Sequence, residues 1–106
     1  MDDILTLDEQ KEILLMYILN ATGRPRELLD TLLHAFPEPL SADQIRHRMS
    51  MTGKHALKSV VRNARIFIEL HEHYDALSDQ CYYSLDDTCI QISKMNRIMN
   101  LLHKRW

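Results

Sequence analysis

The feature that most constrains the fold of this chain is how rarely its helices can be interrupted. Only two glycines and three prolines occur in 106 residues. Glycine commonly ends a helix in a left-handed conformation, and proline removes a backbone donor. We therefore expect long helices separated by a few short breaks. The length matches one domain, 1–106, and is sufficient to bury a core without disulfides or metals.

Two capping boxes mark where helices begin. Thr6-Leu7-Asp8-Glu9 and Ser41-Ala42-Asp43-Gln44 each place a hydroxyl three residues before a Glu or Gln. Gly23 is expected to end the first helix, and Thr52 is expected to cap the fourth. The apolar spacing and these signals predict helices over about 7–20, 25–35, 41–49, 54–70 and 88–104.

The helical periodicity of apolar residues ends after His71, and a β-hairpin is expected there. Two short apolar–polar runs, 74–78 and 81–85, read as strands, and Asp79-Gln80 lies between them as the turn. The predicted order is therefore four helices, a hairpin and a last helix, which makes the fold mainly α.

The stretch 41–67 has the pattern of a helix-turn-helix. In that motif the first helix packs its apolar side on the second, and the second keeps its opposite face free for the DNA major groove. Ile45 and Met49 give the first helix an apolar pair, and Met51 is apolar in the turn. We expect the second helix to pack through Ala56, Val60, Ala64 and Phe67.

The sequence from Ser41 to Val60 resembles the helix-turn-helix of bacterial transcription regulators. Residues 24–85 are similar to a winged helix of the kind found in the DNA-binding effector domains of response regulators. The resemblance implies a winged helix-turn-helix with a hairpin wing, flanked by an N-terminal helix within 7–23 and a C-terminal helix within 88–106. Arg46 departs from the pattern, because a small alanine is usual there, and its side chain is expected to point toward solvent.

Charge distribution points to the same helix. Residues 44–68 contain six Lys and Arg and no Asp or Glu, although the whole chain carries a net charge of −2. On a helical wheel the face opposite Val60 and Ala64 is polar and basic. Arginine and lysine there can contact guanine edges and phosphates. The expected function is sequence-specific binding of double-stranded DNA, through Thr52, Lys54, His55, Lys58, Ser59, Arg62 and Arg65.

The hairpin region favours an alternative function. Residues 69–87 contain six Asp and Glu and no Lys or Arg. A wing that binds the phosphate backbone of DNA usually carries positive charge. The alternative is therefore a winged-helix module that binds a regulatory protein through the acidic hairpin and does not bind DNA.

Both ends of the chain carry more apolar surface than a winged helix requires. The helix over 7–20 has a wide apolar stripe, and 88–104 repeats apolar residues at 3-4 spacing. Packing within one chain is one explanation, and a homodimer is the other. The homodimer interface would include Ile13, Tyr17, Met95, Met99 and Leu102.

Other function classes have little support. No glycine-rich phosphate loop exists, nothing gathers a catalytic set, and His71, His73, Cys81 and Cys89 lack the spacing of a zinc site. We expect neither an enzyme nor a cofactor or metal. No apolar run approaches the roughly 20 residues of a membrane span, and the acidic start is unlike a signal peptide, so a cytoplasmic protein is expected.

Overall fold

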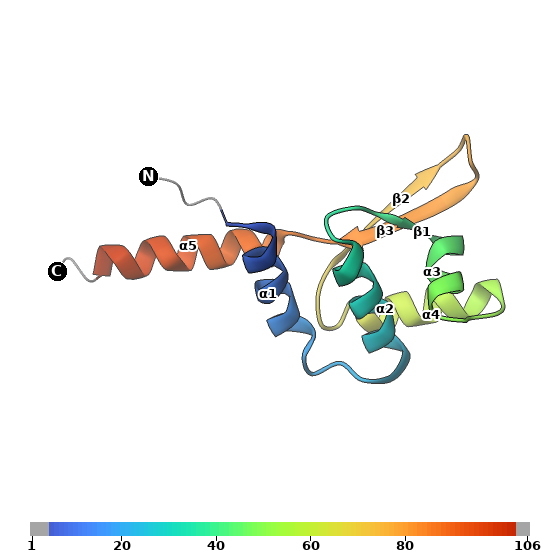
Figure 1. Ribbon diagram of the computed structural model, residues 1–106, viewed down its shortest axis with the longest axis horizontal. Coiled ribbons are helices and arrows are strands. Elements are labelled where there is room, and N and C mark those ends of the chain that lie inside the picture. The colour runs from blue at the N-terminus through green and yellow to red at the C-terminus, as the bar shows by residue number, and fades with distance from the viewer. Residues whose placement is uncertain (1–4, 104–106) are drawn as a thin grey trace.

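The computed structural model describes residues 5–103, apart from the side chains of 54–55 and 98–103. Within this range the chain forms five helices and three strands (Figure 1). The mainly α fold with a hairpin is therefore confirmed. The elements are α1 Leu7–Ile18, α2 Gly23–Ala35, β1 Leu40–Ser41, α3 Ala42–Arg48, α4 Lys54–Ala64, β2 Leu70–Asp75, β3 Gln80–Leu85 and α5 Thr88–His103.

Both predicted capping boxes are present and set the starts of α1 and α3. The Thr6 hydroxyl accepts from the Glu9 amide at 3.2 Å, and the Glu9 carboxylate accepts from the Thr6 amide at 3.1 Å. Ser41 and Gln44 form the same pair of hydrogen bonds, at 3.1 and 2.9 Å. Each box satisfies two of the backbone N–H groups that a helix start leaves without partners.

A small antiparallel sheet has the strand order β1-β3-β2. The β2–β3 hairpin pairs Leu70 with Leu85 at its base, and it projects from the helices in Figure 1. The central strand β3 also pairs with β1, so that Ser41 lies opposite Tyr82. The two-residue strand β1 is too short to give a periodic signal, and it was not expected from the sequence. Because β1 ends directly before α3, its pairing with β3 fixes the start of α3 to the hairpin.

The core lies between the helices and the base of the sheet. α2 packs against α1 and α4, and α1 also packs against α5. The largest side chains that are fully buried come from all five helices: Leu14, Ile18, Leu28, Leu29, Leu32, Ile45, Leu57 and Ile90. These side chains therefore belong to one continuous core.

The fourth helix is shorter than predicted, and the face that it buries differs slightly from the expected one. It ends at Ala64 and not at residue 70, because the Phe67 amide bonds to the Ala64 carbonyl and the chain turns. This turn brings Ile68 into the core. Leu57, and not Ala56, is the buried residue of the first turns, and Ala56 is exposed. A large apolar side chain gains more from burial than alanine does, and this decides the orientation.

Three local predictions also need correction. The N-cap of α4 is Gly53 and not Thr52, with a left-handed φ of 90° and no side-chain cap bond. Gly23 is left-handed as expected, but it begins α2, whereas α1 already ends at Ile18. The first hairpin strand spans 70–75 and not 74–78, because the turn takes four residues and closes at Asp79, whose φ is 54°.

Candidate nucleic-acid interface

One side of α4 is buried and the other is exposed and basic. Leu57, Val60, Val61 and Ala64 face the core, whereas Lys58, Ser59 and Arg62 are exposed. Among the residues whose side chains are described, neither Lys58 nor Arg62 forms an ion pair. An exposed arginine and lysine on one helix, without carboxylates to neutralise them, form a surface that attracts anions.

The remaining predicted contacts lie around this face. Thr52 is exposed in the loop before α4. Lys54 and His55 begin the helix, and their side chains lie outside the described part of the structure. These positions leave Lys58, Ser59 and Arg62 as the described centre of the candidate interface.

Arg65 differs from the other predicted contacts because it is held by acidic residues. Its Nε lies 3.4 Å from Glu69 Oε1, and its Nη2 lies 3.7 Å from Glu72 Oε1. The prediction assumed that the helix continues to residue 70, whereas Arg65 is the residue after its last turn. The turn directs this side chain toward β2, so Arg65 is not a free member of the basic face.

Arg46 is a residue that the sequence prediction missed. Its side chain is only 19% exposed, so the expectation that it points to solvent is wrong. Nη1 donates to Asp43 Oδ1 at 3.0 Å, and Asp43 Oδ2 accepts from the side-chain amide Nε2 of Gln80 at 2.9 Å. Nε is buried and has no hydrogen-bond partner among the described residues. The signal in the sequence was an arginine at a position of the helix-turn-helix pattern where a small residue is usual.

Arg46 lines a cleft between α3, α4 and the hairpin, which we call the Arg46 cleft. Its volume is about 300 Å³. Lys58 from the exposed face of α4 lines the same cleft, together with Asp43, Tyr74 and Asp79. The cleft therefore connects the basic face of α4 with the hairpin, which stands beside α3 in Figure 1.

Most acidic side chains of the hairpin region have partners within the chain. Glu69 and Glu72 hold Arg65, Asp75 accepts from the Leu77 amide and the Ser78 hydroxyl, and Asp79 accepts from the Tyr74 hydroxyl. Asp86 accepts from both the amide and the hydroxyl of Thr88, and these bonds lower the pKa of its carboxyl. Most carboxylates of this segment therefore accept hydrogen bonds in turns and at the start of α5, or form ion pairs with Arg65.

Among the residues that the structure describes, one small group of possible metal ligands lies close together. Ligand atoms of His71, Asp86 and Asp87 lie within 4.8 Å of one another, whereas Cys81 and Cys89 are not part of the group. His71 Nε2 is 3.6 Å from Asp86 Oδ2. His71 and Asp87 are exposed, and Asp86 already accepts from Thr88 at the start of α5, so these hydrogen bonds and the close approach of His71 to Asp86 explain the arrangement.

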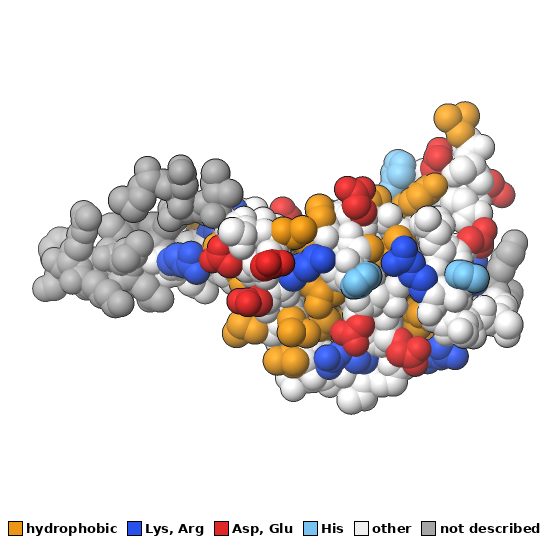
Figure 2. All heavy atoms as spheres, in the orientation of Figure 1, with side chains coloured by type: hydrophobic (Ala, Val, Ile, Leu, Met, Phe, Trp, Pro, Cys, Tyr) orange, Lys and Arg blue, Asp and Glu red, His pale blue; other side chains and the backbone are white. Residues whose placement is uncertain are grey.

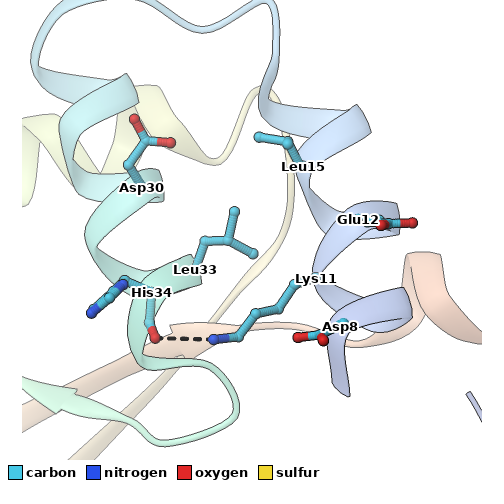
Figure 3. A pocket seen from close by; sticks show the side chains of 7 residues that line it. All are labelled: Asp8, Lys11, Glu12, Leu15, Asp30, Leu33 and His34. Carbon is cyan, nitrogen blue, oxygen red and sulfur yellow. Dashed lines mark hydrogen bonds between the residues drawn. The ribbon is translucent and has the colours of Figure 1, made fainter. Parts of the chain in front are cut away.

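A second surface lies between α1 and α2, which we call the α1–α2 groove. Figure 3 shows Leu15 and Leu33 facing each other across it, with acidic side chains at its edges. The groove has a volume of about 490 Å³, and Lys11 spans it by donating to the His34 carbonyl at 3.2 Å. On this side of the molecule, Figure 2 shows Asp and Glu side chains gathered over α1. The carboxylates of the groove are Asp8, Glu12 and Asp30.

The predicted dimer contacts fall into three groups. Ile13 is partly buried against the core of its own chain, whereas Tyr17 is 40% and Met95 64% exposed. The side chains of Met99 and Leu102 lie outside the described residues. Tyr17 lines a groove of about 310 Å³ together with the apolar Ile66, Phe67 and Ile92 and the charged Arg65, Glu69 and Asp86.

No protein-family model, curated protein or solved structure matches this chain. None of the described helices combines the length and apolar character needed to cross a membrane.

Proposed function

We propose that this protein is a sequence-specific DNA-binding transcription regulator of the winged-helix class. In this proposal α3 and α4 are the helix-turn-helix, α4 enters the major groove, and the β2–β3 hairpin is the wing. Three features support it: the order of the elements from α2 to β3, the short turn between α3 and α4, and the sheet order β1-β3-β2.

The observation that carries the proposal is the exposed face of α4. Lys58 and Arg62 are free of ion pairs among the described side chains, and the 25 residues around them contain no carboxylate. Arginine can bind the O6 and N7 atoms of guanine through two hydrogen bonds, while lysine and serine suit phosphate oxygens. A helix that only covered the core would not need this pattern.

Binding of DNA duplexes at a series of salt concentrations tests the proposal. We expect tight binding at low salt that weakens steeply as salt rises, because bound counterions are released. Arg62→Ala should cost about 1–3 kcal/mol on the preferred sequence. Lys58→Ala should weaken binding to all sequences and lower the salt slope by about one.

Lys11→Ala is the matched control, because Lys11 lies on α1 in the α1–α2 groove and not on α4. Its affinity for DNA should equal that of the wild type. A double variant Lys58→Ala/Arg62→Ala with unchanged affinity would show that α4 does not contact DNA.

We further propose that the protein acts in the cytoplasm as a homodimer, in which a second copy covers the apolar residues of the groove at Tyr17 and the exposed side of α5. Ile92 and Met95 are 45% and 64% exposed and are three residues apart on the helix. Two copies related by a two-fold axis would read two half-sites of DNA.

One observation favours the alternative, a module that binds a protein. The α1–α2 groove combines two leucines with three carboxylates and one lysine. This chemistry suits a partner helix that carries Lys or Arg beside an apolar residue. If the chain binds no DNA at low salt, and a basic amphipathic peptide binds the wild type but not a Glu12→Lys variant, the alternative replaces DNA binding.

A further inference from the structure

We propose that the Arg46 cleft holds a phosphate group of the DNA backbone, bound by Arg46 and Lys58. This inference rests on the proposed DNA-binding function and adds to it a specific contact from α3. Neither the helical wheel nor the resemblance to known regulators assigns Arg46 to the interface.

The position of the cleft makes this contact available. Lys58 belongs both to the exposed face of α4 and to the lining of the cleft. A duplex that meets Arg62 and Lys58 therefore passes beside the opening of the cleft. Arg46 lies within it, and a phosphate there would be held between one cation from α3 and one from α4.

The burial of Arg46 is difficult to explain by folding alone. Its side chain is 81% buried, and its Nε has no acceptor among the described residues. A buried donor without a partner is unfavourable, and an apolar side chain of similar length would avoid that cost. Asp43 occupies only Nη1, so the guanidinium retains donors for a second acceptor. Phosphate oxygens match the planar donor geometry of arginine.

The surrounding contacts hold the guanidinium in place before DNA arrives. Asp43 receives hydrogen bonds from Arg46 and from Gln80, and Gln80 is the first residue of β3. The hairpin thus fixes the orientation of Arg46 through Asp43. Fixing the side chain in advance reduces the entropy lost on binding. An acidic wing can in this way assist DNA binding without supplying a positive charge itself.

The Asp43 carboxylate also lowers the affinity for a DNA phosphate, and this effect can be tested separately. Asp43 and Asp79 line the cleft and repel a phosphate, and Asp43 also neutralises part of the arginine charge. Because the amide oxygen of an asparagine can still accept from Arg46 Nη1 but carries no negative charge, we expect Asp43→Asn to bind DNA more tightly than the wild type. A purely structural role for the Arg46–Asp43 pair does not predict this gain.

The experiment compares DNA affinity and urea unfolding for the wild type, Arg46→Met, Arg46→Lys, Asp43→Asn and Arg62→Ala. Arg46→Met should bind DNA about tenfold or more weakly, with a salt slope lower by about one. Its urea midpoint should be equal to or above that of the wild type, since the buried donor is removed. Arg46→Lys keeps the charge and should retain the salt slope, with reduced affinity because the planar fork is lost.

The outcomes separate this inference from the proposed function. If Arg62→Ala weakens DNA binding while Arg46→Met leaves it unchanged, the phosphate site is wrong and the DNA-binding function stands. If the wild type binds no DNA, the proposed function itself fails. A lower urea midpoint for Arg46→Met, with no gain in affinity for Asp43→Asn, would mean that Arg46 is structural.

A last measurement distinguishes DNA from free phosphate as the source of the anion. The Arg46 Nε–H NMR signal should shift on adding a duplex and should not saturate with inorganic phosphate at the same concentration. Saturation by inorganic phosphate alone would overturn the assignment to the DNA backbone.

Discussion

At the scale of single residues, the role of each cation in the basic segment is decided by its partners. Arg62 and Arg65 are three positions apart in one acid-free stretch, and the sequence treats them alike. In the structure Arg65 lies between Glu69 and Glu72, whereas Arg62 has no described carboxylate partner. The carboxylates come from beyond the helix, so their approach depends on where α4 ends. Helical spacing alone does not contain this information.

Tyr83 gives a prediction at the same scale. It is 4% exposed, and burial together with the charge of Glu72 raises its pKa to about 12 from an ordinary value of 10. Below pH 10 the phenol is protonated in both the folded and the unfolded chain. As the pH rises from 10 to about 12, the unfolded chain loses the proton first, so the free energy of unfolding falls, by at most about 2–3 kcal/mol.

We expect Tyr83→Phe to remove this fall in the free energy of unfolding at alkaline pH. Urea unfolding between about pH 9 and about pH 11.5, the range set by the pKa shift, would measure it. Tyr82→Phe, one residue away and half-buried, is the control and should follow the wild type. A Tyr83→Phe variant that loses stability with pH as steeply as the wild type would contradict the prediction.

At the scale of elements, α3 depends on its cap more than α1 does. Ser41 caps α3, is only 8% exposed and also pairs with Tyr82 in the sheet. We expect Ser41→Ala to lower the free energy of unfolding by about 1–2 kcal/mol, because a half-buried N–H group then lacks its acceptor.

Thr6→Ala is the comparison, since Thr6 forms the same capping box at an exposed site. It should cost about 0.5–1 kcal/mol in urea unfolding followed by circular dichroism. Equal costs for the two variants would show that burial of the Ser41 cap has no separate effect.

The elements also show what the sequence can and cannot predict. The two capping boxes placed the starts of α1 and α3 correctly, because a cap is a contact within four residues. The end of α4 and the pairing of β1 with β3 were missed, since both depend on residues distant in sequence. For the candidate interface, periodicity found Lys58, Ser59 and Arg62. Arg46 required the hairpin to be in place, because Gln80 and Asp43 define its surroundings.

At the scale of the whole molecule, α5 gives the protein an elongated shape. The dimensions are 57 × 31 × 19 Å, and α5 extends away from the other helices in Figure 1. α5 packs against α1, and Ile90 near its start is fully buried. An exposed apolar side on a projecting helix is typical of a surface that a second protein covers.

The proposed homodimer predicts that Met95→Asp yields monomers. A charge on the covered side of α5 would have to be buried without a partner, whereas in a monomer Met95 is 64% exposed and the change should leave the fold intact. Sedimentation velocity at micromolar concentration, with circular dichroism, measures both effects. Met16→Asp on α1, where Met16 is 71% exposed, is the matched control and should remain dimeric. A wild-type protein that sediments as a monomer would disprove the dimer.

The pairing of β1 with β3 also determines when, during synthesis of the chain, α3 and α4 can reach their final arrangement. Ser41 precedes α3 and α4, and its partner Tyr82 follows them, so the chain between the two strands contains the whole candidate DNA-binding segment. During synthesis both helices leave the ribosome before the strand that completes the sheet. A nascent chain that stops before Gln80 has the cations of α4 but lacks the strand that orients α3. Acquisition of the proposed DNA-binding surface is therefore tied to completion of the hairpin and not to formation of its helices.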